Sequence, residues 1–361
     1  MAELIDMEMD FDIFSGPKPI EKESGADIDD SSHDVINAKL RHLRKYFTHP
    51  DVEEICINRP GEIWLRRRRP KPGEDIWNQL ADEELSFKYL EQVCKIIANA
   101  NDRSFGNGKD KTPALYASLP GGHRFTACMY GNIVYDEVTP RGGVVMAIRQ
   151  APRGENVIDY AAYGLTEGVN VRPAPRFKEQ QTDTADSLRK LKAAINGGSH
   201  LIVSGATSTG KTTLLNRIIT ELDPKLRIAT VEDTRELVVP HKNRFHIVLS
   251  RTQQVNSFDD AKAIDLLTRM TPDIIICGEV STSNAGTIWE LTGSGHGSMM
   301  TTIHAEDPEQ ALKTFIDRIR HTQKAIDPET VLREMKSRFT VVQINRDHEG
   351  RRRITAIETF N

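Results

Sequence analysis

The segment Gly205–Thr212, GATSTGKT, has the residue types and spacing of a loop that binds nucleotide phosphates. Gly205 and Gly210 let the backbone turn tightly and aim successive N–H groups at phosphate oxygens. Lys211 would place a positive charge on the β- and γ-phosphates, and the Thr212 hydroxyl would hold Mg²⁺, which prefers oxygen ligands. The predicted nucleotide-binding residues are Gly205, Ala206, Thr207, Ser208, Thr209, Gly210, Lys211, Thr212 and Thr213.

Carboxylates follow two predicted strands later in the chain. Glu232 and Asp233 end the strand in TVEDTREL, and Glu279 follows the apolar run of PDIIICGEV. Ligands of open α/β sheets bind at the carboxyl edge of the strands, so we expect these side chains beside the phosphate loop. There Glu279 could orient the attacking water or hold a Mg²⁺-bound water. Taken alone, each carboxylate could also be a solvated residue at a strand end.

Two histidines, His296 and His304, lie in the Gly- and Thr-rich segment Thr292–Pro308. A histidine in such a loop is either a hydrogen-bonded structural residue or a catalytic one, and the spacing alone leaves both roles open. A zinc site is the weaker interpretation, because no convincing third ligand set accompanies the pair.

The elements around the phosphate loop follow from hydrophobic periodicity. Leu201–Ser204 is expected to be a short buried strand, and Thr212–Leu222 an amphipathic helix whose N-terminus faces the anion. A helix is also expected over Thr184–Gly198. Alternating strands and helices predict an α/β domain with a mainly parallel sheet over residues 184–361, closed by a hairpin around Asp347–Gly350. Its further strands are expected in RIATVED, HIVLS, DIIICGE and SMMTTIHA.

Residues 34–150 are expected to form a smaller α+β domain. Val35–Phe47 and Leu85–Asn101 have apolar residues at helical spacing, and a turn at Asn58–Gly61 separates two predicted strands. These strands are VEEICI and EIWLRR, and two more are expected in HRFTACM and VVMAIRQ. Residues 151–183, rich in Pro, Arg and polar groups, are expected to be a linker between the domains.

The composition fits a soluble two-domain protein of 361 residues, with 38% hydrophobic and 28% charged residues. No apolar run approaches the roughly 20 residues that span a bilayer, and the acidic N-terminus lacks the features of a signal peptide. The four cysteines are widely spaced and form no C-x-x-C pair, which argues against a zinc ribbon or a disulfide framework. A cytoplasmic location is the natural expectation.

Charge is distributed unevenly along the chain. The net charge is −4, but residues 1–34 carry eleven acidic side chains and two lysines, which leaves about +5 on the remainder. Residues 1–33 contain few large apolar side chains and are expected to be a disordered acidic leader.

The four chemical segments together resemble the signatures of the secretion ATPase superfamily, which drives type II and type IV secretion and pilus machines as ring hexamers. They occur in the order GATSTGKTTLL, TVEDTREL, LLTRMTPDIIICGE and TGSGHGSMMTTIHA. EEICINRPGEIWL, Glu53–Leu65, resembles the type IV branch, and the tetracysteine zinc module of typical type II enzymes is absent from the sequence. The resemblance covers about residues 35–345.

This resemblance implies a RecA-like ATPase domain that uses ATP and Mg²⁺, and a homohexamer. It also implies a location in the cytoplasm, peripheral to the bacterial inner membrane, with other type IV secretion components as partners. Glu232 and Asp233 match the acidic box, Asp233 as a metal residue together with Thr212. Glu279 matches the carboxylate that polarises the attacking water, and His304 matches the histidine that senses the γ-phosphate.

Arginines complete the implied site. Arg124 in HRFTACM and Arg149 in VVMAIRQ match N-terminal-domain arginines that contact the nucleotide, and Arg269 matches one that reaches a neighbouring subunit. One residue departs from the pattern, because Ser281 stands where many relatives have an arginine. The departure leaves Glu279 intact and puts the arginine's own role in doubt.

Three other interpretations stay open. The chain could be a pilus assembly or adhesion ATPase of the same superfamily, or a scaffold that binds ATP without turnover, although the intact Lys211 and Glu279 argue against a scaffold. A hexameric nucleic-acid motor is supported by the positive folded part and by Arg66–Arg69. No aromatic stacking pattern accompanies those arginines, so direct nucleic-acid binding is not favoured.

Overall fold

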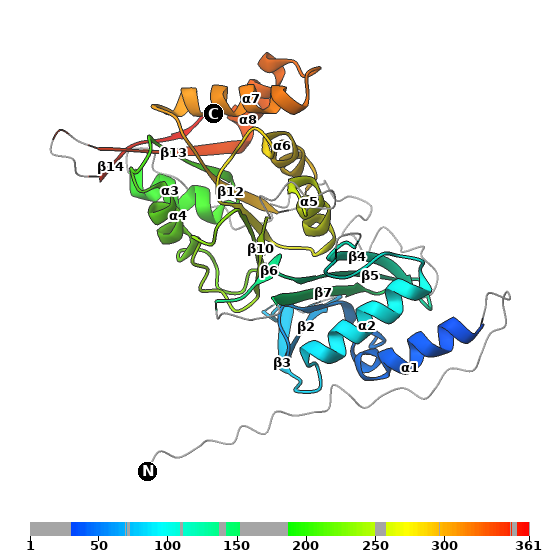
Figure 1. Cartoon of the computed structure of the whole chain (residues 1–361). Helices are drawn as coiled ribbons and strands as arrows, with labels where there is room; N and C mark the ends of the chain where they lie inside the picture. Colours follow the sequence, from blue (N-terminus) through cyan, green and yellow to red (C-terminus); the bar gives the residue numbers. More distant parts are fainter. Residues whose placement is uncertain are drawn as a thin grey trace, which may run out of the picture.

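Two parts of the chain each build a sheet, and Figure 1 shows them lying against each other, the first in blue to teal and the second in green to red. The computed structural model describes residues 30–360 except 69, 71–72, 109–110, 137–141, 152–186, 250–257, 296, 347 and 349–351. The predicted leader 1–33 and linker 151–183 therefore lie almost entirely outside the described residues, as does His296.

The N-terminal part is a six-stranded antiparallel sheet with the order β3-β2-β1-β7-β5-β4. The predicted strands are found at or within a residue of the expected positions. Its elements are α1 (Asp30–Phe47), β1 (Val52–Ile57), β2 (Glu62–Arg67), β3 (Trp77–Ala81), α2 (Phe87–Ala100), β4 (Ala114–Leu119), β5 (His123–Tyr130), β6 (Ile133–Val134) and β7 (Gly143–Arg149).

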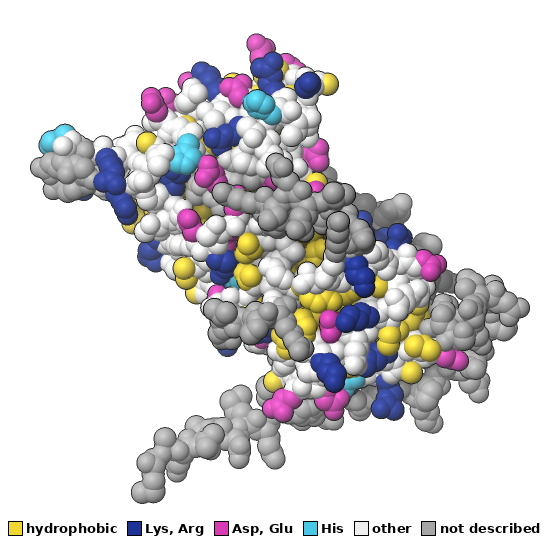
Figure 2. All heavy atoms as spheres, viewed as in Figure 1, with side chains coloured by type: hydrophobic (Ala, Val, Ile, Leu, Met, Phe, Trp, Pro, Cys, Tyr) yellow, Lys and Arg dark blue, Asp and Glu magenta, His cyan; other side chains and the backbone are white. Residues whose placement is uncertain are grey.

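Alternation along these strands explains why the N-terminal sheet is covered on both faces. In β7, Val144, Met146 and Ile148 pack into the core shared with α1 and α2. Val145 and Ala147 point the opposite way and join the core of the second part. One of the apolar cores therefore contains side chains of both parts, and hydrophobic side chains gather near their junction in the space-filling view (Figure 2).

The second part is an eight-stranded sheet with the order β14-β13-β8-β12-β11-β9-β10-β6. Six central strands are parallel, and the two edge strands β14 and β6 run antiparallel to their neighbours. Its strands are β8 (His200–Ser204), β9 (Ile228–Glu232), β10 (Arg244–Val248), β11 (Ile274–Cys277), β12 (Ser298–Ile303), β13 (Phe339–Arg346) and β14 (Arg352–Thr359). Because β6 comes from the N-terminal part, the two parts are also joined by main-chain pairing.

Helices cover both faces of this sheet, which confirms the predicted α/β class. The core under α3 and α4 contains Leu191 and Leu215, and the core on the other face contains Leu266, Ile288 and Phe315 from α5, α6 and α7. None of the helices in the described ranges has the length and apolar character that a bilayer crossing requires. The helices are α3 (Ser187–Asn196), α4 (Lys211–Ile219), α5 (Asp260–Arg269), α6 (Ala285–Gly293), α7 (Pro308–Thr322) and α8 (Pro328–Arg338).

Three details differ from the prediction. Helix α1 begins at Asp30, before the expected Val35, and α4 ends at Ile219, before the expected Leu222. Strands β3, β4 and β6 were not predicted. In β3 only Trp77 is buried, and its other four residues are half-buried or exposed. Hydrophobic alternation therefore does not mark this strand, which forms because it pairs with β2.

Candidate active site

The phosphate loop connects β8 to α4 and contains two left-handed residues, Ser208 with φ of +61° and Gly210 with φ of +94°. Gly210 caps α4, so the helix begins at Lys211 and its free N–H groups face the loop. Gly205 must lack a side chain, because a Cβ there would lie 2.3 Å from the carbonyl oxygen of Ile344 on β13. Both glycines of the motif are therefore required by the backbone geometry.

Lys211, His304 and Glu279 form a line of polar side chains above the loop. The Lys211 Nζ lies 3.0 Å from the carbonyl oxygen of Ala206 and 3.1 Å from Nδ1 of His304. The His304 Nε2 lies 3.5 Å from Oε1 of Glu279. Lys211 opens α4, while Glu279 and His304 follow the neighbouring parallel strands β11 and β12, whose carboxyl ends meet at this edge.

Electrostatics decide which atom of His304 carries the proton. Burial lowers the pKa of Lys211, although the charge of Glu279 opposes the shift. Burial and then the positive charge of Lys211 lower the pKa of His304. Because the lysine ammonium can only donate, Nδ1 of His304 accepts from it and the imidazole proton resides on Nε2, facing Glu279. A neutral His304 therefore links the lysine to the carboxylate.

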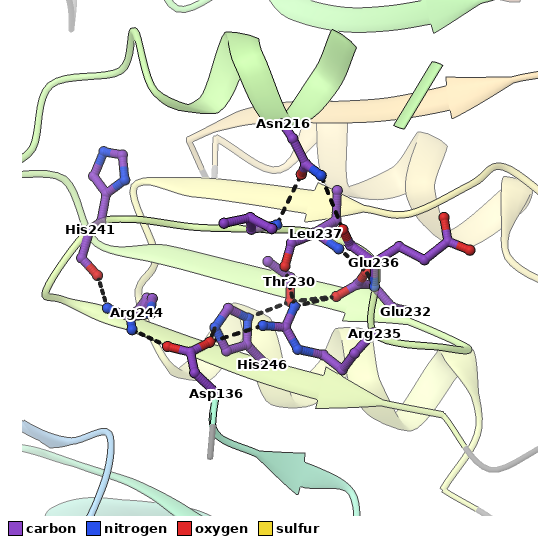
Figure 3. Close-up of polar contacts among 11 residues, drawn as sticks. Asp136, Asn216, Thr230, Glu232, Arg235, Glu236, Leu237, His241, Arg244 and His246 are labelled. Atoms are coloured by element: carbon purple, nitrogen blue, oxygen red, sulfur yellow. Dashed lines mark hydrogen bonds and ion pairs between the residues drawn. The ribbon is translucent and has the colours of Figure 1, made fainter. Parts of the chain in front are cut away.

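Glu232 lies at the end of β9, and its buried carboxylate is engaged by its own loop (Figure 3). Oε1 accepts hydrogen bonds from the backbone N–H groups of Glu236 and Leu237 at 2.8 and 2.7 Å. Oε2 accepts from Arg235 at 2.8 Å. Asp233, the next residue, is exposed and lines the cavity beside the phosphate loop. Both members of the acidic box line this cavity, but Glu232 is buried and bound by its loop while Asp233 is exposed.

Asp136 connects the N-terminal part to the acidic box through ion pairs. It follows β6 and forms ion pairs with Arg235, at 3.3 Å, and with Arg244 of β10 (Figure 3). Since Arg235 also binds Glu232, a chain of alternating charges runs from the first part of the molecule to the end of β9.

A cavity of about 690 Å³ gathers most of the predicted site residues. The phosphate-loop residues Thr207, Ser208, Gly210, Lys211, Thr212 and Thr213 line it together with Glu232, Asp233, Glu279 and His304. Sequence reasoning missed Asp260, Asn284, Thr302 and Arg352, which also line it. They come from α5, the start of α6, β12 and β14. Thr302 lies within the histidine-containing segment Thr292–Pro308, while no local motif marks the other three.

The oxygen groups in this cavity suit Mg²⁺ bound together with a nucleotide. Thr212 and Asp233 both line it, and Mg²⁺ in nucleotide sites is held by one or two protein oxygens plus substrate phosphates. Among the residues that the structure describes, no group of three or more His, Cys, Asp or Glu side chains is placed to hold a metal ion.

Ser281, the residue that departs from the motif pattern, is part of a polar turn after Glu279. Its N–H donates to Oδ1 of Asn284 at 2.7 Å, and its hydroxyl lies 2.9 Å from that of Ser283. Ser283 in turn donates to Asp260 at the start of α5. The turn therefore ties the segment after Glu279 to α5 by short hydrogen bonds.

Arg124, Arg149 and Arg269 are brought together, but away from the phosphate loop. They line a second cavity of about 500 Å³ between β5, β7 and the end of α5, and none lines the first cavity. Arg124 and Arg149 are cross-strand partners, Arg149 pairs with Glu53 at 3.2 Å, and Arg269 pairs with Asp265 at 3.2 Å. Their predicted contact with the nucleotide is therefore not made to the phosphate loop of their own chain in this arrangement.

Comparisons with known proteins agree with the motif resemblance. A family model described as Type II/IV secretion system protein matches residues 174–324. The type IV secretion system protein PtlH of Bordetella pertussis is 28% identical over 292 residues, covering 77% of this chain and 80% of the relative. The type IV secretion system protein VirB11 of Bartonella henselae is 27% identical over 296 residues, covering 77% and 79%.

The fold is shared with a solved structure, the VirB11 ATPase from the Brucella suis type IV secretion system in complex with sulphate. That chain superposes with a TM-score of 0.77 at 23% identity, covering 91% of this chain and 95% of its own. The predicted fold, a RecA-like domain with a smaller N-terminal α+β domain, is confirmed by this match. The resemblance inferred from the four motifs is confirmed by the sequence relatives.

Proposed function

The chain is a relative of the type IV secretion ATPases, and from this premise we propose that it is a Mg²⁺-dependent ATP hydrolase that powers type IV secretion. The observation that carries the proposal is the line Lys211–His304–Glu279 in the cavity beside the phosphate loop. It combines a cation for the phosphates, a polar group between the two charges and a carboxylate for water, which are the parts that phosphoryl transfer to water requires.

Each residue of the line has a separate task in this mechanism. Backbone N–H groups of the loop and the N-terminus of α4 bind the phosphate oxygens, and Lys211 neutralises the charge that develops during transfer. Thr212 and Asp233 would hold Mg²⁺, which supplies further charge neutralisation when bound. Glu279 orients the attacking water, and Nε2–H of His304 donates toward Glu279 until the γ-phosphate offers a stronger acceptor.

We also propose a homohexameric ring at the cytoplasmic face of the bacterial inner membrane, with other type IV secretion components as partners. The second cavity, lined by Arg124, Arg149 and Arg269, is the arginine cavity. A ring would explain why it is separate from the phosphate loop. Arg124, Arg149 and Arg269 of one subunit would face the nucleotide of the next, since a ring interface joins two different surface patches.

The alternatives receive less support from the side-chain contacts. Of the four arginines that favoured a nucleic-acid motor, Arg69 lies outside the described residues. The other three have partners in their own domain: Arg66 with Glu53, Arg67 with Glu74, and Arg68 with the carbonyl oxygen of Val52. A pilus assembly ATPase of the same superfamily would share every contact above, so it differs from the proposal in partners and not in chemistry.

The proposal is tested with Lys211→Ala and Glu279→Gln. We expect Lys211→Ala to abolish hydrolysis, because the charge on the transferring phosphoryl group is no longer neutralised. Glu279→Gln should bind ATP with nearly unchanged affinity while turnover stops. Steady-state hydrolysis and equilibrium ATP binding would be measured for both variants and wild type. Wild-type turnover in Glu279→Gln would remove Glu279 from its role.

A further inference from the structure

The hairpin of β13 and β14 carries two arginines onto the phosphate loop. Strand β13 is the parallel neighbour of β8, the strand that leads into the loop, and β14 pairs with β13 at the edge of the sheet (Figure 1). In the register of the hairpin, Arg346 is directly opposite Arg352. Cross-strand partners project from the same face, so both guanidinium groups are presented to one side.

Both arginines reach the phosphate loop. The Arg346 Nη2 donates a hydrogen bond of 2.8 Å to the carbonyl oxygen of Ser208, one of the two left-handed residues of the loop. Arg352 lies against Gly210, where a Cβ would lie 3.0 Å from its Cδ and 3.1 Å from its Nη1. Arg352 also lines the cavity that contains Lys211 and Glu279. The positive φ of Gly210 favours glycine, and the Arg352 side chain packs directly over it.

Like charges placed directly opposite each other in an antiparallel pair are destabilising. Here both arginines lie against a loop of the kind whose backbone N–H groups bind phosphate oxygens. The guanidinium of Arg346 donates to the carbonyl oxygen of Ser208, and Arg352 lines the cavity. A guanidinium is planar, permanently charged and able to bind two phosphate oxygens at once, so its natural ligand in this cavity is a phosphate chain.

We propose that Arg352 binds the phosphate chain of the nucleotide from within the same chain, and that Arg346 positions the hairpin on the loop. This inference rests on the proposed function, since it requires a nucleotide at the phosphate loop. It gives the site a second cation besides Lys211, supplied by the same subunit. Arg352 is separate from the arginine cavity, and its contact does not depend on ring assembly.

The test is equilibrium binding of ATP and ADP to the full chain carrying Arg352→Ala, with Arg353→Ala as the matched control. Arg353 is the adjacent residue of β14 and projects from the opposite face. Losing a charge-assisted hydrogen bond should weaken both nucleotides about tenfold to a hundredfold in Arg352→Ala. Arg353→Ala should bind as wild type. Thermal unfolding would show that both variants are folded, and Arg352→Lys should recover part of the affinity.

If Arg346 acts by positioning the hairpin, the losses of nucleotide affinity in the Arg346 and Arg352 variants should not add. Arg346→Ala alone should weaken binding, Arg346→Lys should restore it, and Arg346→Ala added to Arg352→Ala should cause little further loss. Fully additive losses would overturn the positioning role. Unchanged ATP and ADP affinity in Arg352→Ala, or an equal loss in Arg353→Ala, would overturn the phosphate contact while leaving the proposed function in place. If wild type itself binds neither nucleotide, the proposed function fails, and this inference fails with it.

Discussion

Glu232 is a single motif residue whose side chain holds the site's loop in place and makes no contact, among the described residues, that chemistry on the nucleotide would require. Its two carboxylate oxygens accept from two backbone N–H groups and from Arg235, and the residue is 4% exposed. A carboxylate engaged in this way has little capacity left for Mg²⁺ or water. The contacts favour an organising role for Glu232 and leave Asp233, which is exposed in the cavity, as the candidate metal residue.

This division of roles predicts different consequences for the two acidic residues. Glu232→Ala should lower the free energy of unfolding by at least about 2 kcal/mol, because buried donors lose their partner. Asp233→Ala should change it by no more than about 0.5 kcal/mol and instead raise the Mg²⁺ concentration needed for half-maximal hydrolysis. Urea unfolding and Mg²⁺ titration of the ATPase rate would check both. A Glu232→Ala variant as stable as wild type but inactive would indicate a direct role on the nucleotide.

At the scale of an element, β10 connects the acidic box to the N-terminal part. Its His246 is 2% exposed, lies 2.8 Å from the hydroxyl of Thr230, and has its Nε2 3.9 Å from Asp136. Burial lowers the pKa of His246 to about 3, with Arg235 and Arg244 adding to the shift and Asp136 opposing it. The histidine is therefore neutral in the folded chain at every pH near neutrality.

The depressed pKa of His246 predicts a loss of stability in acid. The unfolded chain takes up the proton near pH 6.5 and the folded chain only near pH 3, so stability is complete above about 6.5 and falls steadily below it. At pH 5 the loss from this residue should be about 2 kcal/mol. His246→Gln, which keeps a polar partner for Thr230, should unfold in urea with a shallower pH dependence between 6.5 and 5. An unchanged slope would contradict the assignment.

Helix α5 is a second connecting element, because it contributes to both cavities. Asp260 and Ile264 line the first cavity, beside the phosphate loop, while Thr268 and Arg269 line the arginine cavity. The segment after the helix then reaches the N-terminal part, where the hydroxyl of Thr271 donates to the buried carboxylate of Glu54 at 2.8 Å. A rigid helix of ten residues, about 15 Å long, thus spans the distance between the two sites.

At the scale of the whole molecule, a buried arginine fastens the two parts. Arg227 is fully buried and donates to Asn58 in the N-terminal part at 2.9 Å, and to Asn243 and the carbonyl oxygen of Met270 in the second part. Its guanidinium also lies 5.4 Å from the ring centre of Trp77. Buried polar groups of this kind are costly unless satisfied, so they favour one relative placement of the two sheets.

With the two sheets held in one placement, the arginine cavity can reach a nucleotide only across a contact between subunits. Light scattering with Mg²⁺ and a non-hydrolysable ATP analogue should show about six protomers, with the arginine cavity of one subunit at the nucleotide of its neighbour. Arg124→Ala and Arg149→Ala should each lower the ATPase rate about tenfold to a hundredfold, because the cation contact to the γ-phosphate is lost while Lys211 remains.

The control for this pair is Lys95→Ala, an exposed cation on α2, which covers the opposite face of the N-terminal sheet. It should hydrolyse ATP at the wild-type rate. A strictly monomeric chain at micromolar concentration, or normal hydrolysis by both arginine variants, would remove the N-terminal domain from the active site.

Three features could be predicted from the sequence: the phosphate loop, the strands that carry Glu279 and His304, and the α/β class of the second part. The phosphate loop is predicted by its glycine spacing, which the backbone turn requires. The strands are predicted by short apolar runs that end at polar residues. Parallel strands place their carboxyl ends at one edge, so Glu279 was expected beside the phosphate loop. The role of His304 was implied by the family resemblance, and its position between Lys211 and Glu279 is seen in the structure.

The positions of the arginines and the engagement of Glu232 could not be predicted from the sequence. Arg124 and Arg149 were implied as nucleotide contacts by the family resemblance, yet the packing of the two sheets places them in a separate cavity with Arg269. Arg352 was not marked at all, because its position over Gly210 depends on the register of a hairpin with a neighbouring strand. A side chain's partners across strands and domains are set by pairing and packing over long sequence separations, which local periodicity does not encode.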